Sequence, residues 1–181
     1  MDYGKLVFSG SGGQGVITAA IILAEAAVLH EGLVAVQSQS YGPEARGGAT
    51  RSDVIISSTP IHYPKVQQPN VLVCLTQVAY NKYSPIIRPG GLLMTDTRHV
   101  TIQRGVDALH IELPLYATVL EKLAQPIVLN ICMLGALIGL TGLVKPESIM
   151  KVLESRIPPS FLDVNRKALD IGMELGESAA F

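Results

Sequence analysis

Short apolar runs alternate with longer apolar segments along this chain, and this alternation predicts its elements. A short run without polar alternation is typical of a strand buried on both faces of a sheet, whereas a longer segment with helical spacing is typical of a helix. The predicted strands are 5–8, 33–36, 54–56, 71–75, 92–95 and 108–113. The predicted helices are 16–29, 76–83, 116–124, 128–140, 146–156 and 161–175. Strands alternating with helices predict an α/β fold with three layers, α/β/α, around a mostly parallel, Rossmann-like sheet.

Capping residues support several of these boundaries. Gly32 follows the first helix and can adopt the left-handed conformation that ends many helices. Thr76 suits the N-cap of the second helix, and Pro146 suits the first turn of the fifth. At 181 residues the chain is long enough to bury a core, and we expect one domain spanning 1–181.

A glycine-rich turn joins the first predicted strand to the first predicted helix. Its residues are Gly10, Ser11, Gly12, Gly13, Gln14 and Gly15, with the spacing G-x-G-x-x-G. A strand-to-helix turn of this kind can direct backbone N–H groups at a phosphate near the positive end of the helix. The alternative is a tight turn that holds no ligand. An NAD site also needs an acidic residue at the end of the second strand, and the sequence there, Val36-Gln37-Ser38, has none.

A second glycine-rich segment, 37–51, is polar and lacks periodicity, which predicts a long loop. Long loops in compact domains are usually functional. Arg46 offers planar, bidentate recognition of a carboxylate or phosphate. The alternative is a surface turn with an internal pair between Glu44 and Arg46. As an interface or ligand loop, its candidate residues are Tyr41, Gly42, Pro43, Glu44, Arg46, Gly47 and Gly48.

The composition excludes several classes of function. The net charge of −1 gives no general attraction to nucleic acid or anionic lipid, so neither is an expected partner. Hydrophobic residues make up 48% of the chain and charged residues 16%, which suggests that other subunits cover part of the surface. The apolar segment 127–140 is too short to span a bilayer, and the chain starts without a signal peptide, so we expect a cytoplasmic protein.

Candidate catalytic and metal-binding residues are scarce. Cys74 and Cys132 both lie in apolar runs and form no C-x-x-C pair, so we expect reduced core thiols and no iron–sulfur or zinc site. The four histidines show no metal-ligand spacing, and no nucleophile–base pattern emerges. The group Asp96-Thr97-Arg98 follows the fifth predicted strand, where open α/β sheets place functional residues, although an ordinary loop is the favoured interpretation. We therefore expect no catalytic residue and no metal ligand in this chain.

Four segments together resemble a known family. They are G-S-G-G-Q-G at 10–15, S-Y-G-P-E-A-R-G-G-A-T-R-S-D-V at 40–54, L-T-Q-V-A-Y-N-K-Y at 75–83 and P-G-G at 89–91. They resemble the gamma subunit of 2-oxoacid:ferredoxin oxidoreductases over essentially the whole chain. The Ser-Tyr-Gly lead-in at 40–42 and the helix at 79–83 resemble most the 2-oxoglutarate branch. The pyruvate, branched-chain and indolepyruvate branches share the domain.

The resemblance implies an accessory subunit of an enzyme that converts a 2-oxoacid and coenzyme A to an acyl-coenzyme A and CO₂ while reducing ferredoxin. Thiamine diphosphate, Mg²⁺ and the iron–sulfur clusters are then expected on alpha, beta and delta-type partner subunits, with coenzyme A as the ligand that this chain helps to hold. Related fused pyruvate enzymes carry a basic residue shortly after the glycine turn, whereas this chain reads V-I-T-A-A at 16–20. A phosphate contact would then rest on backbone N–H groups, Gln14 and Thr18. The competing hypothesis is a stand-alone module that binds NAD or FAD.

Overall fold

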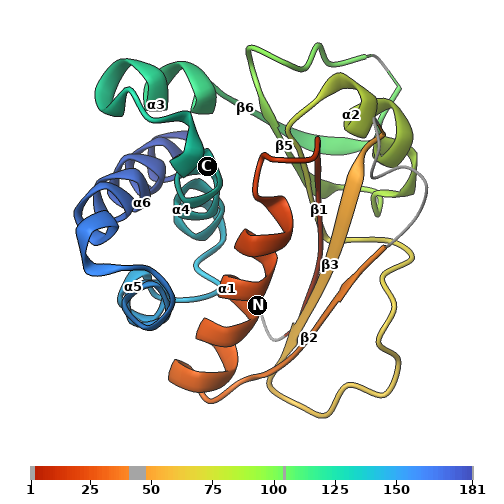
Figure 1. Ribbon diagram of the computed structural model, residues 1–181. Coiled ribbons are helices and arrows are strands. Elements are labelled where there is room, and N and C mark those ends of the chain that lie inside the picture. The colour runs from red at the N-terminus through yellow and green to blue at the C-terminus, as the bar shows by residue number, and fades with distance from the viewer. Residues whose placement is uncertain (1–2, 41–47, 104, 181) are drawn as a thin grey trace.

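A computed structural model describes residues 3–40, 48–103 and 105–180, which form a six-stranded sheet with helices on both faces (Figure 1). The strands are β1 (Tyr3–Gly10), β2 (Val34–Gln39), β3 (Thr50–Ser57), β4 (Val71–Cys74), β5 (Gly91–Asp96) and β6 (Ala108–Leu113). Their order is β2-β3-β1-β4-β5-β6. Among the described residues, β1, β4, β5 and β6 pair in parallel, whereas β3 is antiparallel to both of its neighbours, β1 and β2. The prediction of a mostly parallel α/β sheet is confirmed.

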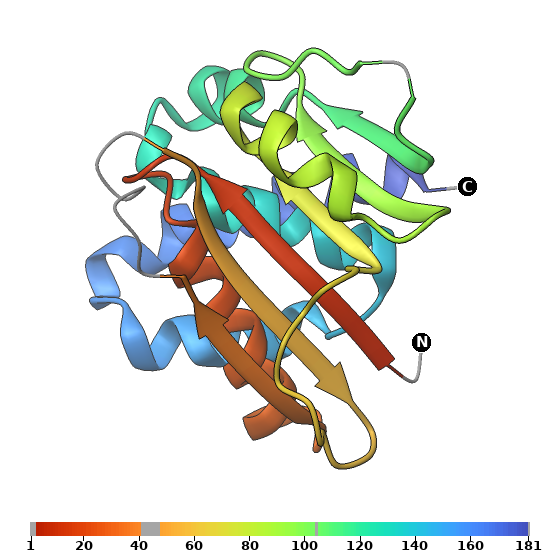
Figure 2. The ribbon, with the colours of Figure 1, turned by 90° about the vertical axis from the view of Figure 1, so that its right-hand side faces the viewer.

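The two faces of the sheet are covered unequally. The helices are α1 (Val16–His30), α2 (Gln77–Tyr83), α3 (Leu115–Leu123), α4 (Leu129–Thr141), α5 (Pro146–Arg156) and α6 (Pro159–Ala179), with short 3-10 turns η2 (Ser84–Ile86) and η3 (Pro126–Val128). Helices α1, α3, α4, α5 and α6 lie on one side, and α2 lies on the other (Figure 1). Seen from the α2 side, that helix covers one part of the sheet while the connection from β3 to β4 crosses another (Figure 2). The larger apolar core therefore lies between the sheet and this group of five helices.

The prediction of a loop over residues 37–51 is wrong at both ends of that range. Strand β2 continues to Gln39 and β3 begins at Thr50. Residues 37–39 pair with 52–54 in the antiparallel ladder, and the Gln37 amide donates to Ser52 Oγ at 2.8 Å. Polar residues lengthen these strands because β2 is at the sheet edge, where their side chains bond across the ladder instead of entering an apolar core.

Helices α4 and α6 pack closely because glycines face each other across their contact. A Cβ added to Gly172 would come within 2.8 Å of the carbonyl carbon of Cys132, and one added to Gly139 within 2.8 Å of the Met173 carbonyl oxygen. The facing glycines are Gly135, Gly139, Gly172 and Gly176. The helix predicted at 161–175 is longer in the structure, because it also packs along α4 beyond those bounds.

The predicted caps are confirmed. The Thr76 hydroxyl accepts from the Ala79 N–H at 3.2 Å, Gly32 has a φ of 67°, and Pro146 is the first residue of α5. A tertiary cap adds to these: the Glu31 carboxylate, just after α1, accepts from the Lys145 N–H at 3.0 Å and the Ser148 hydroxyl at 2.5 Å at the start of α5. These hydrogen bonds hold the pKa of Glu31 below its ordinary value.

Candidate functional site

The glycine turn lies between two neighbouring strands whose following helices pack on opposite faces of the sheet. The chain leaves β1 into α1 on one face, whereas it leaves the neighbouring β4 into α2 on the other face (Figure 1). In open α/β sheets such a switch point opens a crevice outside the carboxyl ends of the strands, and ligands bind there. The fold therefore places residues 10–15 at the position most suited to a ligand.

Internal hydrogen bonds close the turn. The Gln14 side-chain oxygen accepts from the Ser11 N–H at 2.8 Å, and the Gln14 N–H donates to the Ser11 carbonyl at 3.3 Å. A Cβ on Gly10 would come within 2.5 Å of that Gln14 oxygen, so a side chain at position 10 would displace the Gln14 side chain that closes the turn. Gly13 and Gly15 have φ values of 90° and 72°, in the left-handed region that favours glycine. The backbone of the turn thus favours glycine at positions 13 and 15, and the Gln14 side-chain oxygen closes the turn.

The first turn of α1 faces an open cavity of about 300 Å³. Gly15 is the N-cap and supplies no capping side chain, and its carbonyl accepts from the Ala19 N–H at 3.0 Å, the first bond of the helix. The N–H groups of residues 16–18 precede that bond, and amides in this position are the orphan donors of a helix start. The cavity is lined by Ser11, Gly12, Gly13, Gly15, Val16, Ile17, Thr18 and Thr50. Its chemistry is that of an anion site made from backbone amides and hydroxyl groups.

The strand beside β1 is antiparallel, unlike the parallel neighbour of the first strand in a dinucleotide-binding fold. Antiparallel β3 occupies this place, so its first residue, Thr50, lies against Gly10 at the end of β1. The Thr50 hydroxyl donates to the Gly10 carbonyl at 3.0 Å, and the Ser9 hydroxyl donates to the Thr50 carbonyl at 2.7 Å. The end of β2, where an NAD site would carry its carboxylate, lies one strand farther out. The sequence analysis missed Thr50, because only the strand register brings it to the turn.

Asn130 is a second residue that the sequence analysis passed over. It is the second residue of α4, a helix that is apolar on all sides, and it is 9% exposed. Its side-chain amide reaches the carbonyl of Gly15 at 3.4 Å. The signal in the sequence was an asparagine inside an otherwise apolar helical segment.

The second glycine-rich loop is only partly described. Gly48 is half-buried, whereas Tyr41, Gly42, Pro43, Glu44, Arg46 and Gly47 lie outside the described residues. At the base of the loop, the Arg51 guanidinium donates to both oxygens of Asp53, at 2.6 and 2.9 Å, and to the Val66 carbonyl at 2.6 Å. It also lies 5.5 Å above the Tyr83 ring. The bonded Asp53 carboxylate raises the pKa of Arg51. Arg51 thus joins β3, the β3–β4 connection and α2.

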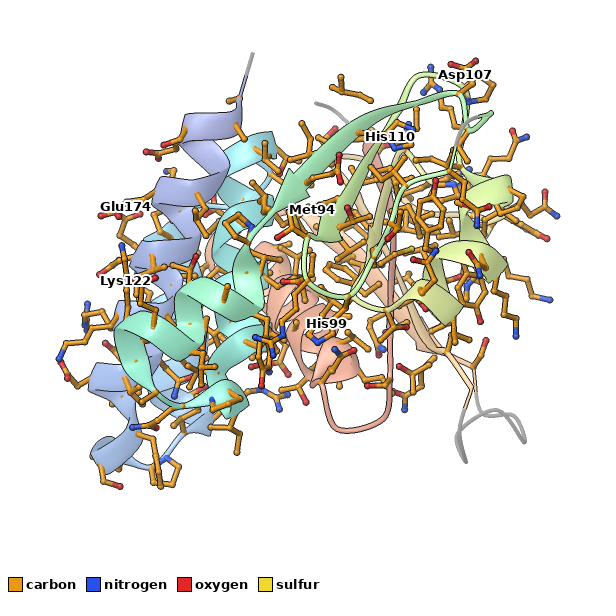
Figure 3. The ribbon with its side chains drawn as sticks, turned by 90° about the horizontal axis from the view of Figure 1, so that it is seen from above. Met94, His99, Asp107, His110, Lys122 and Glu174 are labelled. Carbon is orange, nitrogen blue, oxygen red and sulfur yellow. The ribbon has the colours of Figure 1, made fainter. Side chains whose placement is uncertain are left out.

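Asp96, at the end of β5, serves as a structural cap. One of its carboxylate oxygens accepts from the Tyr116 N–H at 2.7 Å, which caps the start of α3. The other accepts from the Arg98 N–H at 2.9 Å and contacts His99 Nδ1 at 3.1 Å. These contacts support the favoured interpretation of 96–98 as an ordinary loop. Figure 3 labels His99 in this loop, with Lys122 and Glu174 on the helical side of the molecule.

The described residues do not fit an iron–sulfur cluster or a metal ion. Cys74 and Cys132 are both free and buried, as predicted. Burial raises the pKa of Cys74, and burial together with the nearby Asp96 carboxylate raises the pKa of Cys132 to about 12. Within the described parts of the chain no three histidine, cysteine or acidic side chains lie close enough to hold a metal. None of the described helices is long and apolar enough to cross a membrane.

Known proteins match nearly the whole of this chain. The family described as pyruvate ferredoxin/flavodoxin oxidoreductase matches residues 5–175. The 2-oxoglutarate synthase subunit KorC of Methanocaldococcus jannaschii is 44% identical over 175 residues, covering 96% of this chain and 94% of that subunit. The pyruvate synthase subunit PorC of Methanothermobacter marburgensis is 33% identical over 178 residues, covering 94% of this chain and 96% of that subunit.

Two solved structures agree with these relatives. The gamma subunit of a keto/oxoacid ferredoxin oxidoreductase from Geobacter sulfurreducens superposes with a TM-score of 0.90 at 41% identity, over 99% of both chains. A 2-oxoglutarate:ferredoxin oxidoreductase from Magnetococcus marinus, solved with 2-oxoglutarate, coenzyme A and succinyl-CoA bound, gives a TM-score of 0.88 at 21% identity. The match covers 98% of this chain and 32% of that longer one, and at this identity it shows the fold alone.

Proposed function

Because this chain belongs to the pyruvate ferredoxin/flavodoxin oxidoreductase family, we propose that it is the gamma subunit of a 2-oxoglutarate:ferredoxin oxidoreductase. The whole enzyme would convert 2-oxoglutarate, coenzyme A and oxidised ferredoxin to succinyl-CoA, CO₂ and reduced ferredoxin. Higher identity to a 2-oxoglutarate synthase subunit than to a pyruvate synthase subunit, each over nearly the full length, supports this substrate. This chain would contribute binding and assembly surfaces, while the chemistry takes place on its partners.

The observation that carries the site proposal is the open cavity of about 300 Å³ at the start of α1. We propose that the N–H groups of residues 16–18, with the hydroxyls of Ser11 and Thr18, contact a phosphate of coenzyme A there. Ser11 and Thr18 are both exposed to solvent. These donors are neutral, and neutral donors hold phosphate more weakly than charged ones. The remaining affinity would come from partner subunits, which fits a chain that is inactive alone.

The proposed partners are the alpha, beta and delta-type subunits of the same enzyme, with ferredoxin reached through the complex. These subunits would hold thiamine diphosphate, Mg²⁺ and the iron–sulfur clusters. The described residues support this division, because both cysteines are buried thiols unsuited to ligating a cluster. We further propose that the chain is one domain and that it works in the cytoplasm.

Reconstitution of the complex with and without this chain tests the assignment, with substrate-dependent ferredoxin reduction as the assay. We expect activity with 2-oxoglutarate to exceed activity with pyruvate or 2-oxoisovalerate. In the complete complex, Ser11→Glu places a carboxylate at the rim of the cavity and should raise the KM for coenzyme A by about tenfold or more through charge repulsion. The KM for 2-oxoglutarate should stay unchanged. Ser178→Glu, at an exposed position near the end of α6, is the matched control.

Three results would count against these proposals. Full activity and an unchanged KM for coenzyme A in a complex that lacks this chain would show that the enzyme does not need it. An unchanged KM for coenzyme A in Ser11→Glu would refute the phosphate contact alone. Tight binding of NAD or FAD by the isolated chain in calorimetry would support a stand-alone dinucleotide module instead.

A further inference from the structure

Asn130 is a polar residue in a buried and otherwise almost entirely apolar helix. Apart from Asn130 and Thr141 at its last position, α4 consists of apolar residues, cysteine and glycine, and its first ten residues are buried. A buried amide is unfavourable in such surroundings unless its donors and acceptor are bonded. An apolar side chain would satisfy the packing of α4 better, so the reason for asparagine must lie in what it contacts.

The Asn130 side chain bridges the starts of two helices. Its oxygen accepts from the Ile131 N–H at 3.0 Å, one of the orphan amides in the first turn of α4. Its nitrogen donates to the Gly15 carbonyl at 3.4 Å, at the N-cap of α1. A Cβ on Gly15 would come within 2.6 Å of that nitrogen, so the approach depends on glycine at position 15. The two residues are 115 positions apart in the sequence.

The Gly15 carbonyl fixes the direction of a donor in the candidate phosphate site. The same carbonyl accepts from the Ala19 N–H at 3.0 Å, so two donors hold it along the axis of α1. The described residues contain no cis peptide bond, and in a trans peptide the N–H points opposite to the carbonyl. When the Gly15 carbonyl points into α1, the Val16 N–H points the opposite way, out of the start of the helix, where Val16 and Gly12 line the cavity.

We propose that Asn130 is a positioning residue: through the Gly15 carbonyl it holds the glycine turn so that the first amides of α1 face the ligand. The ligand contact rests on the proposed function, whereas the effect on the turn does not. Asn130 itself contacts the turn and not the cavity, which is lined by other residues.

Two variants separate the hydrogen bond from the packing. Asn130→Leu keeps a side chain of similar size and removes both hydrogen bonds. Asn130→Asp keeps the acceptor for the Ile131 N–H, places a favourable negative charge at the start of α4, and removes the donor to Gly15. Thr141→Val is the matched control: it removes the other polar side chain of α4, whose hydroxyl donates to the Leu137 carbonyl at 2.7 Å at the far end of the helix.

The first measurement is amide hydrogen exchange of Ala19 in the full chain, because this N–H shares the Gly15 carbonyl with Asn130. We expect exchange about tenfold faster in both Asn130 variants and unchanged in Thr141→Val. The second measurement, in the reconstituted complex, is the KM for coenzyme A, which should rise about tenfold in both variants while kcat stays within about twofold.

The outcomes distinguish this inference from the proposed function. Unchanged exchange of Ala19 in both folded variants would overturn the positioning role. Faster exchange with an unchanged KM for coenzyme A would also overturn it, provided that Ser11→Glu raises that KM. If neither Ser11→Glu nor the Asn130 variants change the KM, the coenzyme A contact is refuted, while faster exchange still supports the hold of Asn130 on the turn.

Discussion

Substituting alanine for Gly172 tests whether backbone proximity between α4 and α6 holds the helical layer together. Intrinsic helix propensity predicts that Gly172→Ala stabilises the protein, by about 1 kcal/mol in a helix interior. The structure predicts the reverse. The new Cβ would overlap the Cys132 carbonyl oxygen, well inside the 3.0 Å that real Cβ contacts essentially never violate, and would also come within 2.9 Å of the Ala136 nitrogen. These obstacles are backbone atoms, so no side-chain rotation relieves the overlap.

The magnitude follows from the contact that must be restored. For ordinary van der Waals contact at 3.4 Å or more, the two helices must separate by about 1.4 Å, which opens gaps along a densely packed interface. Overpacking costs typically about 1–3 kcal/mol, and a backbone overlap belongs at the upper end of that range. After the gain in propensity, we expect a net loss of about 2 kcal/mol in the free energy of unfolding.

Urea unfolding followed by circular dichroism, with equal m-values required, measures this difference in the isolated chain. The matched control is Asp170→Ala, on the exposed side of the same helix, which should stabilise slightly because it gains propensity without any overlap. Gly139→Ala, whose Cβ would meet a carbonyl oxygen at 2.8 Å, should be destabilised less than Gly172→Ala. A Gly172→Ala chain as stable as the wild type would refute the reasoning.

Three further predictions concern caps and thiols. Glu31→Gln should lower the free energy of unfolding by about 0.5–1 kcal/mol at pH 7. Because folding lowers the pKa of Glu31 from 4.5, this difference from wild type should persist above pH 4.5 and disappear as the pH falls through the folded pKa, which urea unfolding at a series of pH values measures. Asp96→Ala removes the cap of α3 and leaves the Tyr116 and Arg98 N–H groups without their acceptor. The melting midpoint should therefore fall by several degrees, corresponding to about 2 kcal/mol, and a fall of less than one degree would contradict the capping role. Cys74 and Cys132 should resist alkylation at pH 8 in the native chain and react in 6 M urea, because both are buried with raised pKa values; rapid native labelling would contradict this.

The sequence determined the local features of this protein. The alternation of apolar runs and helical segments predicted all six strands and six helices of the described residues, apart from their end positions. Capping residues predicted the starts of α2 and α5, and the glycine spacing predicted the turn after β1. These features are predictable because turn geometry, capping and amphipathic spacing depend on residues within a few positions of one another.

Only the tertiary structure decided which distant residues meet. The antiparallel insertion of β3 beside β1 brings Thr50 to the glycine turn, and the packing of α4 brings Asn130 to Gly15. The polar stretch 37–39 predicted a loop, but pairing with β3 made it a strand. Strand order, register and helix contact are set by the burial and hydrogen bonding of the whole chain, and no local pattern records them. The sequence therefore located the turn, and the tertiary structure supplied the neighbours that shape it.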